Sequence, residues 1–76
     1  MDLIQFTEEK INHYAQMIVS HPDRADELAM GQLQFYMAFR RVQQGKATLE
    51  DAGLMDAIND VLQVRGLVEV DTTFYK

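Results

Sequence analysis

The residues best suited to chemistry in this sequence are two histidines and a group of carboxylates. His13 has Glu9 four residues before it, so on a helix the pair could orient an imidazole or supply two metal ligands. A zinc site usually takes at least three protein ligands, and no second H-x-x-x-H or E-x-x-H element supplies the others. We therefore interpret Glu9 and His13 as a solvated pair of side chains.

The second histidine, His21, stands in a proline turn between Ser20 and Asp23. A catalytic Ser–His–Asp triad needs side chains that converge from separate elements of a fold, which residues so close in sequence do not provide. These three residues are typical of a helix cap and a turn.

Carboxylates gather in the C-terminal third of the chain. Asp56 and Asp60 are one helical turn apart, with Glu50, Asp51 and Glu69 near them in sequence. Paired carboxylates can hold Mg²⁺ or exchange protons, but they are also what the outer face of a helix commonly carries. The chain has no Gly-rich phosphate loop, EF-hand spacing or nucleophile elbow. We therefore predict no enzyme activity, no cofactor and no metal. A solvated helix face is the first interpretation of these carboxylates, and docking of a basic partner surface is the alternative.

Length and composition indicate one small domain inside a cell. The chain has 76 residues, no cysteine and a formal net charge of -5 at pH 7. Small secreted domains usually depend on disulfides, which this chain cannot form. The first ten residues also lack the basic segment and long apolar core of a secretion signal. We expect one domain over residues 1–76, located in the cytoplasm.

The charge balance also narrows the range of partners. Acidic residues outnumber lysine and arginine twelve to seven. Nucleic acids and anionic membranes bind through Lys and Arg, so neither is the expected partner. The pair Arg40 and Arg41 is the densest basic feature, and the apolar run 35–39 is far too short to span a bilayer. A basic protein fits this composition better.

The first predicted helix has two alternative starts. Asp2 and Gln5 can form an N-cap and its partner three residues later. Alternatively, Thr7 is the cap, and residues 3–6 form a short extended arm. Residues 8–19 are predicted to be helical under both alternatives. The apolar face of this helix is expected to hold Ile4, Ile11, Ala15 and Ile18, with Tyr14 beside them.

Proline and glycine mark the second helix. Because proline cannot continue a helix but fits its first turn, this helix is predicted from about Pro22 or Arg24 to Gln44, with Gly45 as its stop. Gly31 in its middle costs about 1 kcal/mol relative to alanine. Close approach of another backbone is the expected compensation, with a kink as the alternative.

A third helix is predicted between a capping box and a glycine stop. Thr48 and Asp51 have the spacing of the box, and Gly66 follows the last helical residue. Gly53 should weaken the first turns, so regular helix is expected only from about Leu54. The residues expected to face inward are Leu54, Ile58, Val61 and Leu62.

The C-terminal residues have the alternating pattern of an extended chain. Val68, Val70, Thr72 and Phe74 fall on one side of it. The fold class is therefore mainly α: a three-helix domain with an extended or short β C-terminal tail.

One short segment resembles a known DNA-binding family. Residues 61–69, VLQVRGLVE, are similar to the end of a recognition helix and the first wing strand of winged-helix domains. The resemblance covers nine residues and implies a degenerate DNA-binding module. No short helix and turn of the usual pattern precede residue 54, and Asp56 and Asp60 would place negative charge at the DNA groove.

The stretch 28–42 is where the sequence predicts a partner to bind. At helical spacing it carries two apolar rows, and methionine adapts well to partner surfaces. The rows are Leu28, Phe35, Phe39 and Val42, and Ala29, Leu33, Tyr36 and Met37. Two flanking helices are not expected to cover residues 35–39 completely, so we predict a homodimer or a protein-binding surface there. The predicted function is a small non-catalytic interaction module whose binding residues are Phe35, Tyr36, Met37, Phe39, Asp56 and Asp60.

Overall fold

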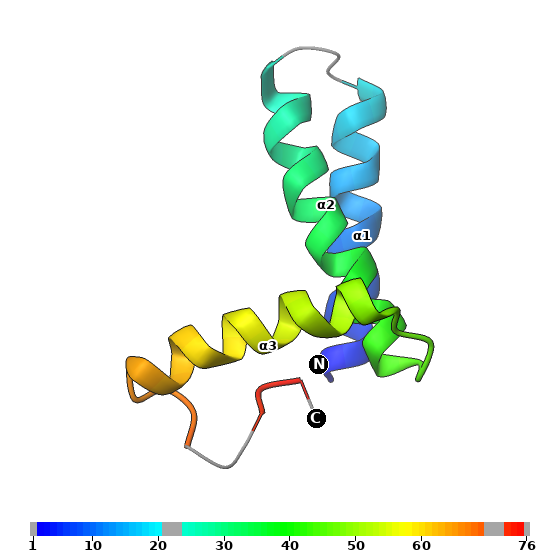
Figure 1. The fold of residues 1–76 in the computed structure, drawn as a ribbon. Coiled ribbons are helices and arrows are strands. Elements are labelled where there is room, and N and C mark those ends of the chain that lie inside the picture. Colours follow the sequence, from blue (N-terminus) through cyan, green and yellow to red (C-terminus); the bar gives the residue numbers. More distant parts are fainter. Residues whose placement is uncertain (1, 21–23, 70–72, 76) are drawn as a thin grey trace. The chain divides into compact units, whose positions relative to one another are not determined.

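Three α-helices make up most of the chain (Figure 1), as the sequence predicts. The computed structural model describes residues 2–20, 24–69 and 73–75, and no strand occurs among them. The helices are α1 (Leu3–Ser20), α2 (Arg24–Gln43) and α3 (Leu49–Val64). The mainly α fold class is thus confirmed. Of the predicted tail, Val70 and Thr72 lie outside the described residues, as do His21 and Asp23.

The chain divides into two compact units. The first is Met1–Arg40, which holds α1 and most of α2, and the second is Arg41–Lys76, which holds α3. The prediction of one domain over 1–76 stays a prediction.

The first helix begins at the earlier of its two alternative starts. The carboxylate of Asp2 accepts a hydrogen bond from the backbone N–H of Gln5 at 2.7 Å, which is the contact of an N-cap residue. Thr7 is therefore not the cap. It is fully buried inside α1, and its hydroxyl donates to the carbonyl oxygen of Leu3 at 2.8 Å. That bond lets a threonine sit within the helix without an unsatisfied hydroxyl.

The two long helices run side by side in opposite directions within the first unit (Figure 1). Ile11 of α1 is buried, as are Ala29, Ala38 and Phe39 of α2. Ile4 was expected on the inner face of α1 but is 62% exposed, and Leu28 of α2 is exposed as well. Both lie near the start of their helices.

Glycines end α2 and α3 in the same way. Gly45 and Gly66 have φ angles of +72° and +75°, in the left-handed region that glycine adopts without steric cost. After α2, the N–H of Lys46 donates to the carbonyl of Arg41 at 2.8 Å, and the N–H of Gly45 donates to that of Val42 at 3.1 Å. After α3, the N–H of Leu67 donates to the carbonyl of Leu62 at 2.9 Å, and the N–H of Gly66 donates to that of Gln63 at 3.0 Å. Both ends are Schellman motifs, which satisfy the last carbonyls of a helix.

Gly31 has no close neighbour. A Cβ added at this position would meet nothing within 4 Å, so the expected close approach of another backbone is wrong. A Cβ added at Gly53 would also meet nothing within 4 Å. Gly53 does not delay the start of α3, which is helical from Leu49 onward, five residues earlier than predicted. The capping box explains why. The Thr48 hydroxyl accepts from the Asp51 N–H at 3.0 Å, and the Asp51 carboxylate accepts from the Thr48 N–H at 3.0 Å.

The inward face of α3 differs from the predicted one. Met55 is fully buried, and Asp51 and Asn59, one turn to either side, are buried too. Leu54 and Val61, which were expected to face inward, are 43% and 62% exposed. Apolarity alone favours the leucine and valine positions. Asp51 and Asn59 can be buried because their polar atoms are hydrogen-bonded.

Candidate interaction surface

An aromatic cluster joins α1 to α2 within the first unit. Tyr36 is at its centre: its ring stacks on Tyr14 with 6.0 Å between centroids and meets Phe6 edge to face at 6.1 Å. Phe35 contacts Tyr36 at 5.1 Å and stacks on Phe39 at 5.6 Å. These geometries are the favourable ones for aromatic pairs. The cluster therefore holds the two helices together.

The four α2 residues assigned to a partner from sequence divide into two kinds by their exposure. Phe39 is 4% exposed and belongs to the core. Phe35, Tyr36 and Met37 are half-buried, so each contacts its own chain and still presents part of its side chain to solvent. A partner could touch these three residues, whereas Phe39 is covered by the chain itself.

Both arginines of the predicted basic pair are occupied. One Nη of Arg40 contacts the two carboxylate oxygens of Glu8, at 3.2 and 3.1 Å. Arg41 binds Asp51 through Nε at 2.6 Å and Nη2 at 2.8 Å. Because each guanidinium faces a carboxylate, the pair does not form an open patch of positive charge.

The carboxylate of Asp51 accepts hydrogen bonds from both Arg41 and the Thr48 backbone. Two hydrogen bonds from Arg41, and after them the bond from the Thr48 backbone, hold the pKa of Asp51 well below its usual range. The same contact raises the pKa of Arg41. Asp51 therefore has a structural role, joining the end of α2 to the start of α3.

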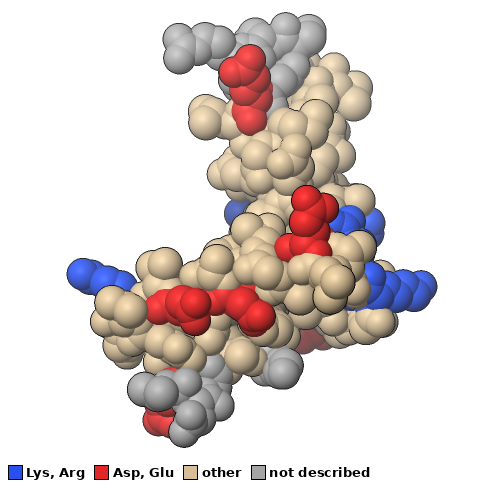
Figure 2. All heavy atoms as spheres, in the orientation of Figure 1, with Lys and Arg blue, Asp and Glu red and all other residues tan. Residues whose placement is uncertain are grey.

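The two aspartates predicted for a partner lie on the exposed side of α3. Figure 2 shows acidic atoms in a row along this helix. The hydroxyl of Tyr75 donates a hydrogen bond to Asp56, which raises the pKa of Tyr75, and burial and the charges of Asp56 and Asp60 add to the effect. One turn away, the Phe74 N–H donates to the Asn59 side chain at 2.8 Å. Residues 74 and 75 are thus fastened to α3 beside its acidic side chains.

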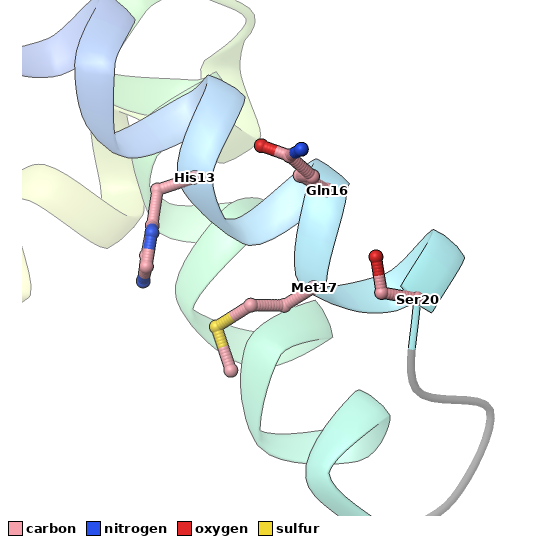
Figure 3. Close-up of a pocket in the computed structure, with 4 residues that line it drawn as sticks. All are labelled: His13, Gln16, Met17 and Ser20. Atoms are coloured by element: carbon pink, nitrogen blue, oxygen red, sulfur yellow. The ribbon is translucent and has the colours of Figure 1, made fainter.

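His13 is exposed on α1, and together with Phe6, Glu9 and Lys10 it lines one hollow of the surface. It also lines a shallow hollow of about 230 Å³ with Gln16, Met17 and Ser20, all from α1, and Figure 3 shows the His13 and Met17 side chains on the same side of the helix. Its ring packs edge to face on Tyr14 at 5.1 Å. Among residues 2–20, 24–69 and 73–75, no three His, Cys, Asp or Glu side chains come close enough to hold a metal ion.

One surface was missed by the sequence reasoning. Leu54, Ala57, Val61 and Val64 lie along one exposed side of α3, and we call this set the α3 stripe. Leu54 and Val61 were instead assigned to the core. The available signal was the spacing of 3, 4 and 3 residues, the a/d pattern of helices that pair with other helices.

Comparison with protein-family models, with curated proteins and with solved structures gives no match to this chain. In the part of the chain that the structure describes, no helix has the length and apolarity needed to cross a membrane.

Proposed function

We propose that this protein is a small non-catalytic interaction module of the cytoplasm. It forms a homodimer and binds or blocks a protein partner through apolar and acidic surface. The observation that supports this function is the number of large apolar side chains left in solvent. Ten of the described residues are of this kind: Leu3, Ile4, Val19, Leu28, Met30, Leu49, Leu54, Val61, Val64 and Leu67.

Single exposed apolar residues are normal on any protein, but residues aligned on one helix face are typical of an interaction site. The α3 stripe has this alignment. In the first unit, the open parts of Phe35, Tyr36 and Met37 offer a second apolar surface.

Charge supports a basic partner over a nucleic acid. The net charge is -5, Arg40 and Arg41 are each paired with a carboxylate, and α3 presents exposed Asp56 and Asp60. On the exposed side of α3, duplex DNA would face carboxylates and would lack the contacts with Lys and Arg that give proteins their affinity for DNA.

Two measurements test the proposal. Sedimentation equilibrium over a micromolar concentration series should show reversible association of the 8.8 kDa chain toward twice that mass. A single 8.8 kDa species throughout would contradict the homodimer. Titration with duplex DNA should show no binding, whereas binding that weakens steeply with added salt would favour the winged-helix alternative.

A further inference from the structure

We propose that a second copy of this chain docks on the α3 stripe, so that two α3 helices pair side by side and parallel. This inference rests on the proposed function, because it assigns the dimer contact of that function to one surface. The half-buried Phe35, Tyr36 and Met37 then remain for a different protein.

The stripe lies on a side of α3 that its own unit leaves uncovered. Each residue turns a helix by about 100°, which separates three sides of α3. The first side is buried and centres on Met55. The second side lies beside the first. It holds Asp56, which accepts a hydrogen bond from Tyr75, and Asn59 at its buried edge, which accepts one from the Phe74 N–H. The α3 stripe is the third side, roughly opposite the second.

The composition of the stripe suits contact with another helix. Leu54 and Val61 take the a positions of a heptad, and Ala57 and Val64 take the d positions. The small side chain of Ala57 lets a second helix approach closely at the centre of the stripe. Exposure rises along it, from 43% at Leu54 to 87% at Val64, so most of this apolar surface meets only water in one chain.

Charged residues beside the stripe select the second copy and its direction. Asp60 and Arg65 are both exposed and flank the stripe on opposite sides, at the g position and the following e position. In a parallel pair, Asp60 of one copy faces Arg65 of the other, twice by symmetry. In an antiparallel pair, Asp60 would face Asp60 of the other copy. Within one chain, Asp60 and Arg65 are about 140° apart around the helix, too far to neutralise each other directly.

Single cysteines give a direct test, because the natural chain has none. In a parallel pair, equal stripe positions face each other, about 5–7 Å apart between Cα atoms, which a disulfide can bridge. Leu54→Cys and Val64→Cys should each form crosslinked homodimers on mild oxidation. Leu49→Cys is the matched control, since Leu49 is also exposed and on α3 but off the stripe, and it should crosslink severalfold less. An antiparallel pair would crosslink only a mixture of the two stripe variants.

Charge reversal provides a second test that does not depend on oxidation. Asp60→Arg alone and Arg65→Asp alone should each raise the dissociation constant of the dimer by about 2- to 10-fold, from two surface ion pairs. The double variant should restore it. Circular dichroism should show unchanged helix content in all three variants.

The outcomes separate this inference from the proposed function. A wild-type chain that dimerises, with no preference for crosslinking at Leu54 and Val64 over Leu49, would overturn docking on the α3 stripe and leave the homodimer standing. A wild-type chain that stays monomeric would overturn both the homodimer and its docking site.

Discussion

Arg41 at the end of α2 holds Asp51 in the first turn of α3 through two parallel hydrogen bonds, of 2.6 and 2.8 Å. The same carboxylate completes the capping box with Thr48. One side chain thus fixes the start of a helix and ties it to the helix before it.

Acid should remove the stabilisation that Asp51 provides. Its folded-state pKa lies below the unfolded value of about 3.9, so the stabilisation is complete above that pH and is lost as pH falls toward the folded pKa. Asp51→Asn should lower the urea midpoint at pH 7 and make it less dependent on pH between about 5 and 2. Glu50→Gln, at the exposed neighbouring position, is the control and should leave the pH dependence near that of the wild type.

The phenol of Tyr75 should ionise at a higher pH than an ordinary tyrosine. Its hydrogen bond to Asp56 favours the neutral form, so this contribution to stability is present below the unfolded pKa of about 10 and is lost as pH rises through the folded pKa. The pKa of Tyr75 can be measured as the part of the phenolate absorbance, followed against pH, that is lost in the Tyr75→Phe variant. Asp56→Asn should return the pKa of Tyr75 toward the ordinary tyrosine value, and Asp60→Asn should lower this pKa by a smaller amount.

Gly31→Ala should stabilise the protein by up to about 1 kcal/mol, because alanine is the better helix former and its methyl group meets no neighbour. Gly45→Ala is the matched control, with an expected effect on stability of the opposite sign. Its φ of +72° strains any residue with a Cβ, so it should destabilise. Thermal denaturation of both variants measures the difference. A loss of stability in Gly31→Ala would show that another molecule or backbone does approach this position.

Phe39→Ala should destabilise by about 3–5 kcal/mol, a large part of the stability of so small a domain. Phe39 is buried and stacks on Phe35. Leu28→Ala is the control, because Leu28 is exposed and its loss should change little. Equal urea midpoints for the two variants would contradict the core assignment of Phe39.

Helix ends were predictable from sequence where a local side chain or glycine determines them. Gly45, Gly66 and the Thr48–Asp51 box act within a few residues of themselves, so their spacing identifies them. The expectation that Gly53 would delay regular helix to Leu54 was wrong, because the box already starts α3 at Leu49. The start of α1 had two candidate caps of equal local quality. Asp2 forms the cap, and Thr7 lies inside the helix, where it is buried and its hydroxyl donates to the Leu3 carbonyl.

The inward face of α3 was not predictable in the same way. Hydrophobic periodicity ranks Leu54 and Val61 above Asp51 and Asn59, yet the aspartate and asparagine are buried. Their partners are Arg41, ten residues away, and Phe74, fifteen residues away. A pattern confined to one helix contains neither partner. For the same reason Leu54 and Val61 of the α3 stripe were predicted to lie in the core.

The capping box and the glycine stop at the two ends of α3 also affect the order in which the chain folds. Its capping box and glycine stop are formed by residues within or next to the helix, and the Arg41–Asp51 contact spans only ten residues. The Glu8–Arg40 contact of the first unit spans 32. Shorter loops lose less entropy on closing, so we expect α3 and its contact with Arg41 to form before α1 meets α2. Thr48→Ala should then slow refolding, whereas Phe39→Ala should mainly accelerate unfolding.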